Sequence, residues 1–236
     1  MFHLVISAVL IISTILLMSL VIILFIYFYN KKSYVFMFDI SDFPPISKLN
    51  NNLLENYDNI KTEVDALKSK KVSTIVIEKG AIYNERGKEI AEEIKKQDAW
   101  TVGWDSKDDW MQYPIIYKGE VFENAKKNLP VICSYVEPIK DCFHSLFIST
   151  IKAHGEIPEH CDGGDKSKVL EKNRLTYHFN IDCPPESILS IDDVKMVQKN
   201  KNNIVFDSSY KHYVKNNSSY PRTILCAKFY ITKCNK

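Results

Sequence analysis

Four residues in the C-terminal half of the sequence have the types and spacing of an iron site. His160 and Asp162 form a His-x-Asp pair, and His212 stands far beyond them. Two imidazoles and a carboxylate on one face of an Fe(II) ion leave open positions for substrate chemistry, as in non-haem Fe(II) oxygenases. Arg222 follows ten residues after His212, and a guanidinium binds carboxylates through paired hydrogen bonds. The hypothesis is that the first three residues hold iron and that Arg222 anchors 2-oxoglutarate.

The His-x-Asp pair also has a simpler interpretation. It runs into Gly163 and Gly164, and Asp-Gly and Gly-Gly steps mark turns. A polar turn would explain this segment without a metal. The surroundings favour the metal, because residues 203–207 predict a short strand before His212 and residues 223–231 predict a second one. The end of a strand suits a metal-binding His, since the scaffold fixes its orientation.

Longer stretches around these residues resemble the aspartyl/asparaginyl β-hydroxylase family. The resemblance covers roughly residues 110–232, about half of the chain. It implies a double-stranded β-helix, a jelly-roll or cupin-like core, that uses Fe(II), 2-oxoglutarate and O₂. We therefore expect a mainly β fold with flanking helices. The similar segments are residues 114–119, 147–150, 157–162, 174–178, 204–212 and 221–222.

The resemblance also implies roles for individual residues. It assigns the two widely spaced His to the metal and Arg222 to the far carboxylate of 2-oxoglutarate. His178 would contact the other carboxylate, assisted by a hydroxyl near Ser149 or Thr150. All of these are expectations from the resemblance.

The sequence departs from the family at two positions. Animal members have a glycine where Asp162 stands, so this chain has the full two-His, one-carboxylate set. The family often has an arginine two residues before the cosubstrate His, and here that residue is Thr176. Residues 174, 176 and 178 share one face of a strand because side chains alternate. Arg174 is therefore a candidate substitute for the missing arginine.

Composition and length predict one catalytic domain behind an anchor. The 236 residues are 45% hydrophobic and 25% charged, an ordinary balance for a folded protein. The formal net charge of +2 and the lack of a long basic block argue against nucleic-acid binding. The predicted regions are a transmembrane anchor (1–32), a juxtamembrane and flanking helical region (33–105), and a double-stranded β-helix oxygenase domain (106–236).

The anchor is predicted from residues 4–29, which contain no charged side chain. A helix of that length can cross a hydrocarbon core of about 30 Å. The stretch is too long for a signal peptide and ends in aromatics followed by Lys31 and Lys32. We expect a single-pass membrane protein. The positive flank favours a cytoplasmic catalytic domain, whereas animal relatives place theirs in the secretory lumen.

Apolar spacing predicts the remaining elements. Pro44-Pro45 should interrupt regular structure, helices are expected at 50–70, 84–96 and 119–128, and the chain should become β-rich from residue 131. A hairpin is expected within 187–198. The other predicted β-rich runs are residues 72–78, 142–151, 172–182, 203–207 and 223–231.

The cysteines and the other histidines are predicted to be structural. None of the six cysteines forms a Cys-x-x-Cys pair, which argues against a zinc ribbon. Their even number would allow three disulfides, but a chain of this size does not need them. Cys161, between two proposed ligands, should pack away from the metal. His144 and His154 should be structural or solvent-facing.

The leading functional hypothesis is an Fe(II)- and 2-oxoglutarate-dependent dioxygenase. By family analogy its substrate would be an Asp or Asn side chain of a protein. A lipid acyl chain near the membrane is the alternative substrate. From other classes, the chain could be a non-catalytic cupin-like module that binds metal or a partner, or a structural membrane protein. The last reading would leave the four residues of the proposed site unexplained.

Overall fold

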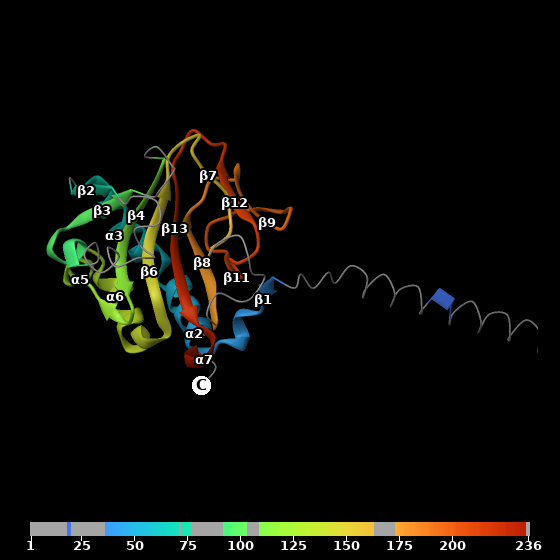
Figure 1. Cartoon of the computed structure of the whole chain (residues 1–236), viewed down its shortest axis with the longest axis horizontal. Helices are drawn as coiled ribbons and strands as arrows, with labels where there is room; N and C mark the ends of the chain where they lie inside the picture. The colour runs from blue at the N-terminus through green and yellow to red at the C-terminus, as the bar shows by residue number, and fades with distance from the viewer. Residues whose placement is uncertain are drawn as a thin grey trace, which may run out of the picture. The chain divides into compact units, whose positions relative to one another are not determined.

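A computed structural model of the chain describes residues 18–19, 36–70, 72–76, 92–102, 109–162 and 173–234. The chain divides into two compact units, Met1–Val35 and Phe36–Lys236. The second unit contains both β-sheets and the helices that accompany them (Figure 1). Its strands and short helices make the chain mainly β with some helices.

The larger sheet has nine strands in the order β1-β11-β8-β13-β6-β4-β3-β2, with β5 paired to β4. Within the described residues, β2 and β3 run parallel and the other pairs of this sheet are antiparallel. The strands are β1 (Met37–Phe38), β2 (Ser73–Val76), β3 (Ala99–Val102), β4 (Trp110–Tyr117), β5 (Glu120–Val121), β6 (Phe143–Ile151), β8 (Arg174–Asp182), β11 (Asn203–Phe206) and β13 (Arg222–Tyr230).

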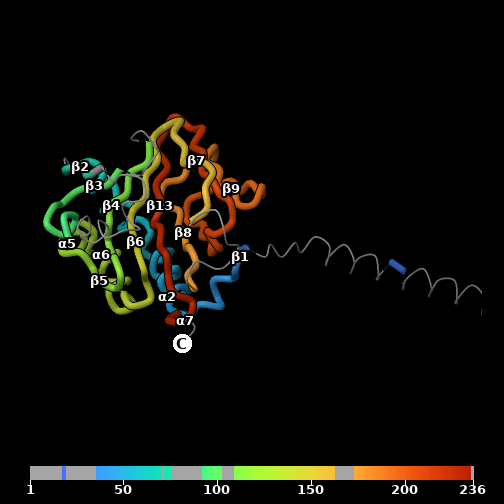
Figure 2. The backbone as a smooth tube through the Cα atoms, in the orientation of Figure 1, coloured from blue at the N-terminus to red at the C-terminus, as the bar shows by residue number. Residues whose placement is uncertain are grey.

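The smaller sheet has four strands in the order β10-β9-β12-β7. From β6 onward the strands belong in turn to the larger and the smaller sheet, with β9 and β10 together in the smaller one, and Figure 2 shows β6 followed by β7. Strand ends from both sheets are thereby brought together. The strands of this sheet are β7 (Glu156–His160), β9 (Ser187–Ile191), β10 (Val194–Val197) and β12 (His212–Asn216).

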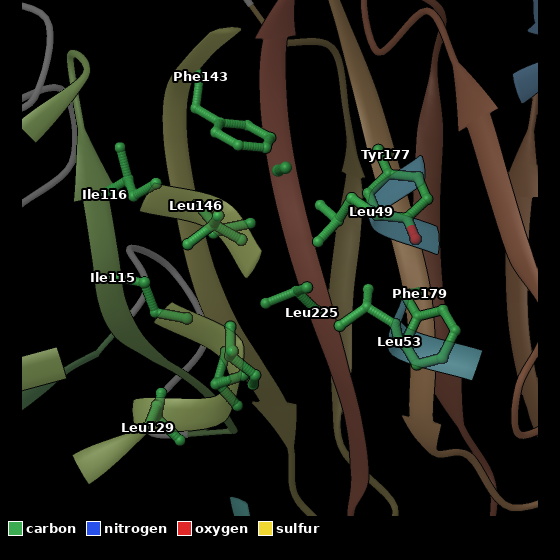
Figure 3. Close-up of a cluster of buried hydrophobic side chains, with 14 of the residues drawn as sticks. Leu49, Leu53, Ile115, Ile116, Leu129, Phe143, Leu146, Tyr177, Phe179 and Leu225 are labelled. Atoms are coloured by element: carbon green, nitrogen blue, oxygen red, sulfur yellow. The ribbon is translucent and has the colours of Figure 1, made fainter. Parts of the chain in front are cut away.

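Helices cover one face of the larger sheet. Figure 3 shows Leu49 and Leu53 from a helix lying against Tyr177 and Phe179 on β8, with Leu225 on β13 beside them. These side chains are buried, and their removal from water is the main stabilising contribution of this layer. The helices are η1 (Ile40–Asp42), α2 (Pro44–Glu55), α3 (Tyr57–Ser69), α5 (Glu123–Asn128), α6 (Pro130–Val136), η3 (Glu137–Cys142) and α7 (Ile231–Cys234).

Alternation along β8 separates the core from the candidate site. Tyr177 and Phe179 point into the helix-covered core. Thr176 and His178 therefore point to the opposite face, because successive side chains of a strand alternate. That face is turned toward the smaller sheet, since Thr176 Oγ1 donates a hydrogen bond to Ser208 Oγ, which lies just before β12, at 2.9 Å. The same strand thus builds the core and one wall of the site.

The helix predicted at 50–70 exists but is divided and begins earlier. α2 starts at Pro44, so the prediction that the proline pair interrupts regular structure is wrong. Proline is tolerated in the first helical turn, where its missing N–H would have no partner anyway. α2 ends at Glu55 and α3 begins at Tyr57. Of the helix predicted at 84–96, residues 92–96 are helical, and 84–91 lie outside the described residues.

Two predictions around residue 120 are wrong. The helix expected at 119–128 starts only at Glu123, because Lys118 and Gly119 have positive φ angles of 50° and 79° and turn the chain from β4 into β5. The chain does not become β-rich at residue 131 but forms α6 from Pro130. The β-rich run begins at Phe143 instead.

The predicted strands around the site are confirmed. Runs expected at 142–151, 172–182, 203–207 and 223–231 correspond to β6, β8, β11 and β13. The hairpin expected within 187–198 is formed by β9 and β10, which turn at Asp192 and Asp193 with φ angles of 46° and 66°. Of the run at 72–78, Ser73–Val76 is a strand, and 77–78 lie outside the described residues.

The predicted single-pass membrane localisation is contradicted. In the part of the chain that the structure describes, no helix has the length and apolarity needed to cross a bilayer. The longest described helix, α3, has 13 residues, or about 20 Å, against about 30 Å of hydrocarbon core. The predicted anchor at residues 4–29 itself lies outside the described residues, apart from Met18 and Ser19.

Candidate metal centre

Three predicted ligands, His160, Asp162 and His212, converge at one end of the smaller sheet. His160 is the last residue of β7, and His212 is the first residue of β12. The two residues are direct cross-strand partners, and their ring centroids are 4.2 Å apart. One ligand atom from each of the three residues lies within 4.8 Å of the others. Residues more than 50 positions apart in sequence are therefore brought to a common point.

Backbone carbonyls fix the orientation of both imidazoles. Nδ1 of His160 is 2.7 Å from the carbonyl oxygen of Pro158, and Nδ1 of His212 is 2.8 Å from that of Tyr210. A carbonyl can only accept, so each Nδ1 donates, and in the neutral form of each imidazole Nε2 is the nitrogen with the free lone pair. Metal-binding His residues are commonly oriented by a hydrogen bond of this kind. The tautomer required for Nε2 ligation is thus already set.

Asp162 completes the group. Its backbone N–H donates to the carbonyl of Ser208 at 2.9 Å, which holds the residue beside the loop leading to β12. Oδ1 lies 3.6 Å from Nε2 of His160, and Oδ2 lies 4.0 Å from Nε2 of His212. Neighbouring ligand atoms around an octahedral ion stand about 3 Å apart, so small side-chain adjustments would close the group on a metal.

The electrostatics favour the protonation states that a metal needs. Burial alone would raise the pKa of Asp162, but the ammonium of Lys228, through its charge and its hydrogen bond, is the first of the neighbouring groups that outweigh burial and hold the pKa well below the ordinary value. Burial lowers the pKa of His212, and Asp162 opposes that shift. An ionised carboxylate beside a neutral imidazole is the state that ligates a divalent cation. The donor set and its protonation therefore fit the iron site expected from the sequence.

Lys228 was not among the sequence-predicted site residues. It lies on β13, and its Nζ is 3.1 Å from Oδ2 of Asp162. Its side chain is 18% exposed. A lysine within the apolar run of a predicted core strand is the signal that could have identified it, because lysine is seldom buried without a charged partner.

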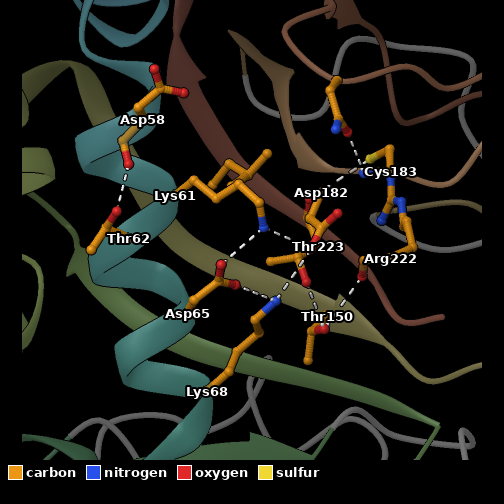
Figure 4. Close-up of polar contacts among 12 residues, drawn as sticks. Asp58, Lys61, Thr62, Asp65, Lys68, Thr150, Asp182, Cys183, Arg222 and Thr223 are labelled. Atoms are coloured by element: carbon orange, nitrogen blue, oxygen red, sulfur yellow. Dashed lines mark hydrogen bonds and ion pairs between the residues drawn. The ribbon is translucent and has the colours of Figure 1, made fainter.

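Arg222 lies buried at the start of β13. It is 1% exposed, and its Nε donates to Oε1 of Gln198 at 2.7 Å. Its Nη2 has no hydrogen-bond partner among the described residues. Figure 4 shows Arg222 next to Cys183 and Thr150. Burial lowers the pKa of the guanidinium. A buried cation whose neighbours are neutral calls for an anion, and a carboxylate from a cosubstrate would supply it.

His178 lies on the site face of β8. It is opposite Cys226 of β13, which stands between Arg222 and Lys228 in that strand. Its Nδ1 has no hydrogen-bond partner in the described part of the chain. Burial, together with the charge of Arg222, holds the pKa of His178 well below its ordinary value. His178 is thus a neutral group in the position expected for a cosubstrate contact.

The three remaining residues predicted to contact the cosubstrate are Ser149, Thr150 and Arg174, and both hydroxyls already have hydrogen-bond partners within the protein. Thr150 is engaged in joining strands, with its hydroxyl 3.0 Å from that of Thr223 and 3.3 Å from the carbonyl of Arg222. Ser149 accepts a hydrogen bond from Trp110 Nε1 at 2.9 Å. Arg174 is buried at the first position of β8, opposite Tyr230 and on the face of Thr176 and His178.

The other two predicted structural histidines lie outside the His–Asp–His group. His154 is exposed, and His144 is partly buried against the rings of Tyr117 and Tyr230. None of the six cysteines takes part in a disulfide within the described residues. Gln198 is a second residue that sequence reasoning missed, since nothing in the sequence links it to Arg222.

Residues 54–231 match the model of the family described as aspartyl/asparaginyl beta-hydroxylase. The chain belongs to the aspartyl/asparaginyl β-hydroxylase family. The description of the family is that of a hydroxylase. Membership also confirms the resemblance derived from the sequence segments around the His–Asp–His group.

One relative in this family comes from Acanthamoeba polyphaga mimivirus. That protein, the uncharacterized protein L888, is 31% identical over 186 residues, which are 78% of this chain. The alignment covers 66% of the relative's own length, slightly less than two thirds.

Among solved structures, similar folds are found at low identity. A predicted oxalate decarboxylase from Thermotoga maritima is 7% identical, with 51% of this chain and 80% of that chain covered and a TM-score of 0.35. The Cnp3 cupin domain from Schizosaccharomyces pombe is 8% identical, with 36% and 55% covered and a TM-score of 0.29.

Proposed function

We propose that this member of the aspartyl/asparaginyl β-hydroxylase family is an Fe(II)- and 2-oxoglutarate-dependent dioxygenase. The observation that carries the proposal is the convergence of His160, Asp162 and His212, with Nδ1 of each imidazole hydrogen-bonded to a backbone carbonyl, so that Nε2 is turned to the shared point. Two neutral N donors and one carboxylate leave half of an octahedral iron open. When bound, iron would supply the O₂ activation that converts 2-oxoglutarate to succinate and CO₂ while a substrate C–H bond becomes C–OH.

The second support is the buried Arg222. Its unpartnered Nη2 lies at the start of β13, and Gln198 holds its Nε. A guanidinium fixed on one side and open on the other can form a bidentate pair with the far carboxylate of a diacid. His178 would contact the keto-acid end from β8. The residues would therefore bind, orient and shield the cosubstrate from water.

The fold of the catalytic region is proposed to be a double-stranded β-helix. The alternation of strands between the two sheets from β6 to β13 supports this assignment. All the proposed site residues lie within residues 106–236, which we take as the oxygenase domain. An Asp or Asn side chain of a protein is the proposed substrate, and family membership is its support.

Replacing His212 with alanine tests the proposal. We expect His212→Ala to abolish Fe(II)-dependent formation of succinate from 2-oxoglutarate, because a two-ligand site would not hold iron in the required geometry. Succinate is measured with purified protein under air. A matched control is His154→Asn, which changes an exposed His whose φ of 58° suits asparagine. Near-normal succinate formation by His212→Ala would refute the metal assignment.

A further inference from the structure

With a divalent metal bound, Lys228 would leave an excess of positive charge at the proposed site. Its Nζ lies 3.1 Å from Oδ2 of Asp162, the oxygen that also faces His212. A divalent cation bound by these ligands would be close to this ammonium and would be repelled by it. Arg222 adds a second fixed positive charge on the same strand. One carboxylate cannot balance a divalent metal and two cationic side chains, so further negative charge must enter when the site is loaded.

The positions of Arg222 and Lys228 indicate that the incoming anion has two negative ends. β13 pairs with β6 in continuous register from Arg222 to Lys228, so residues 222, 224, 226 and 228 share one face. Both cations contact groups outside the larger sheet, since Arg222 bonds Gln198 and Lys228 bonds Asp162. About 20 Å of strand separates their Cα atoms. Two long side chains and a five-carbon diacid together can span that distance, and His178 lies opposite Cys226, between the two cations.

The residue opposite Lys228 on the neighbouring strand β8 is neutral, so a positive charge at this place in the pocket has to come from β13. Lys228 is the direct cross-strand partner of Thr176 on β8, the position at which the family often has an arginine. Thr176 is short and neutral, and its hydroxyl donates to Ser208 Oγ at 2.9 Å. Residues facing each other across a strand pair reach the same volume above the sheet. Lys228 can therefore deliver a positive charge where a side chain at position 176 would otherwise deliver it.

We propose that Lys228 is the second cationic anchor of the cosubstrate pocket, binding the keto-acid carboxylate of 2-oxoglutarate while Arg222 binds the far one. This inference rests on the proposed function. It differs from a role in which Lys228 only positions Asp162, because such a role would affect metal binding rather than cosubstrate binding. Arg174, which shares the face of Thr176, is the competing candidate for this carboxylate.

The test separates metal affinity from cosubstrate affinity. Full-length wild type, Lys228→Met, Lys228→Arg and Arg174→Met are titrated first with Mn(II) alone, then with 2-oxoglutarate at saturating Mn(II), and both dissociation constants are measured by calorimetry. Manganese serves as a metal probe for the site. Lys126→Met is the matched control, because Lys126 pairs with Glu123 and Glu137 outside the site.

We expect Lys228→Met to bind Mn(II) at least as tightly as wild type and 2-oxoglutarate about tenfold or more weakly, since a charge-assisted hydrogen bond is lost. Lys228→Arg should retain most of the cosubstrate affinity. The inference is overturned if Lys228→Met weakens Mn(II) alone, or if only Arg174→Met weakens 2-oxoglutarate. Absence of 2-oxoglutarate binding by Mn(II)-loaded wild type would overturn the proposed function as well. Circular dichroism checks that each variant is folded.

Discussion

At the scale of single residues, the site is defined by side chains whose partners are incomplete. Arg222 is 1% exposed, yet one end of its guanidinium has no partner among the described residues. Nδ1 of His178 is in the same state. Buried polar groups are nearly always hydrogen-bonded, because leaving one unpaired is unfavourable. Two such groups on one face of the larger sheet destabilise the ligand-free protein, and a bound diacid would give both of them a hydrogen-bond partner.

Arg222→Met is predicted to maintain or raise the stability of the ligand-free protein and to lower its affinity for 2-oxoglutarate. The ligand-free variant should be as stable as wild type or more stable, because an uncompensated buried charge is replaced by an apolar chain of similar length. Its affinity for 2-oxoglutarate should fall by roughly a hundredfold, the loss expected for a bidentate charged pair. Thermal unfolding with and without 2-oxoglutarate measures both effects. An unchanged upward shift of Tm on adding 2-oxoglutarate would exclude Arg222 as the anchor.

At the scale of elements, distant carboxylates hold the helical layer in place. Leu129, which precedes α6, provides no side-chain cap. The cap comes from α3, where the two carboxylate oxygens of Glu63 accept from the N–H groups of Val131 and Ile132, each at 2.9 Å. A carboxylate at this end also interacts favourably with the helix dipole. α6 therefore depends on a residue that lies 68 positions before Val131 in the sequence.

Glu63→Ala should destabilise the protein by about 2 kcal/mol, because two N–H groups lose a charged acceptor. For a chain of this size that corresponds to a fall in Tm of roughly 4–8 °C. Thermal unfolding followed by circular dichroism measures it. Glu55→Ala, at the exposed end of α2, is the control and should change Tm little. Equal effects of the two substitutions would show that the cap contributes nothing specific.

A second carboxylate, Asp98, joins four elements. It precedes β3 and accepts hydrogen bonds from Lys70 after α3, from the hydroxyl of Tyr113 on β4 and from Asn128 at the end of α5. Burial alone would raise the pKa of Asp98, but these donors and the charge of Lys70 lower it below its ordinary value. The ionised form is therefore favoured in the folded state.

The sign of this shift predicts how stability changes with pH. A carboxyl whose pKa is lower in the folded state contributes stability above its unfolded pKa of about 4 and loses it as pH falls through the folded pKa. Asp98→Asn should destabilise the protein by about 1–2 kcal/mol at neutral pH and by progressively less below pH about 4. Urea unfolding at a series of pH values measures this. Glu186→Gln, an exposed change, is the control, and a pH-independent difference for Asp98→Asn would contradict the prediction.

At the scale of the whole molecule, local sequence patterns predicted the strands around the site, whereas features that depend on long-range contacts were missed. The strands around the site were predictable because β-rich runs lie between turn residues. His160, Asp162 and His212 could be singled out because residue type and local spacing are visible in the sequence, and the structure shows that the three side chains converge. α6 could not be predicted because its cap is supplied by Glu63. Lys228 could not be assigned because its role depends on which residue stands opposite it.

The membrane localisation was the main error at this scale. Hydropathy of residues 4–29 predicted an anchor, but the described part of the chain contains no helix that could cross a bilayer. The helices that are described have an apolar face that packs on the larger sheet. Their hydrophobic residues stabilise the core between α2, α3 and β8.

The position of β7 links metal occupancy to the integrity of the fold. β7 lies at one end of the smaller sheet, and β12 is its only pairing partner among the described strands. The two imidazoles face each other across this single ladder, at the last residue of β7. An ion held between them would clamp the outermost strand to its neighbour, so release of the ion and fraying of that edge would be coupled events.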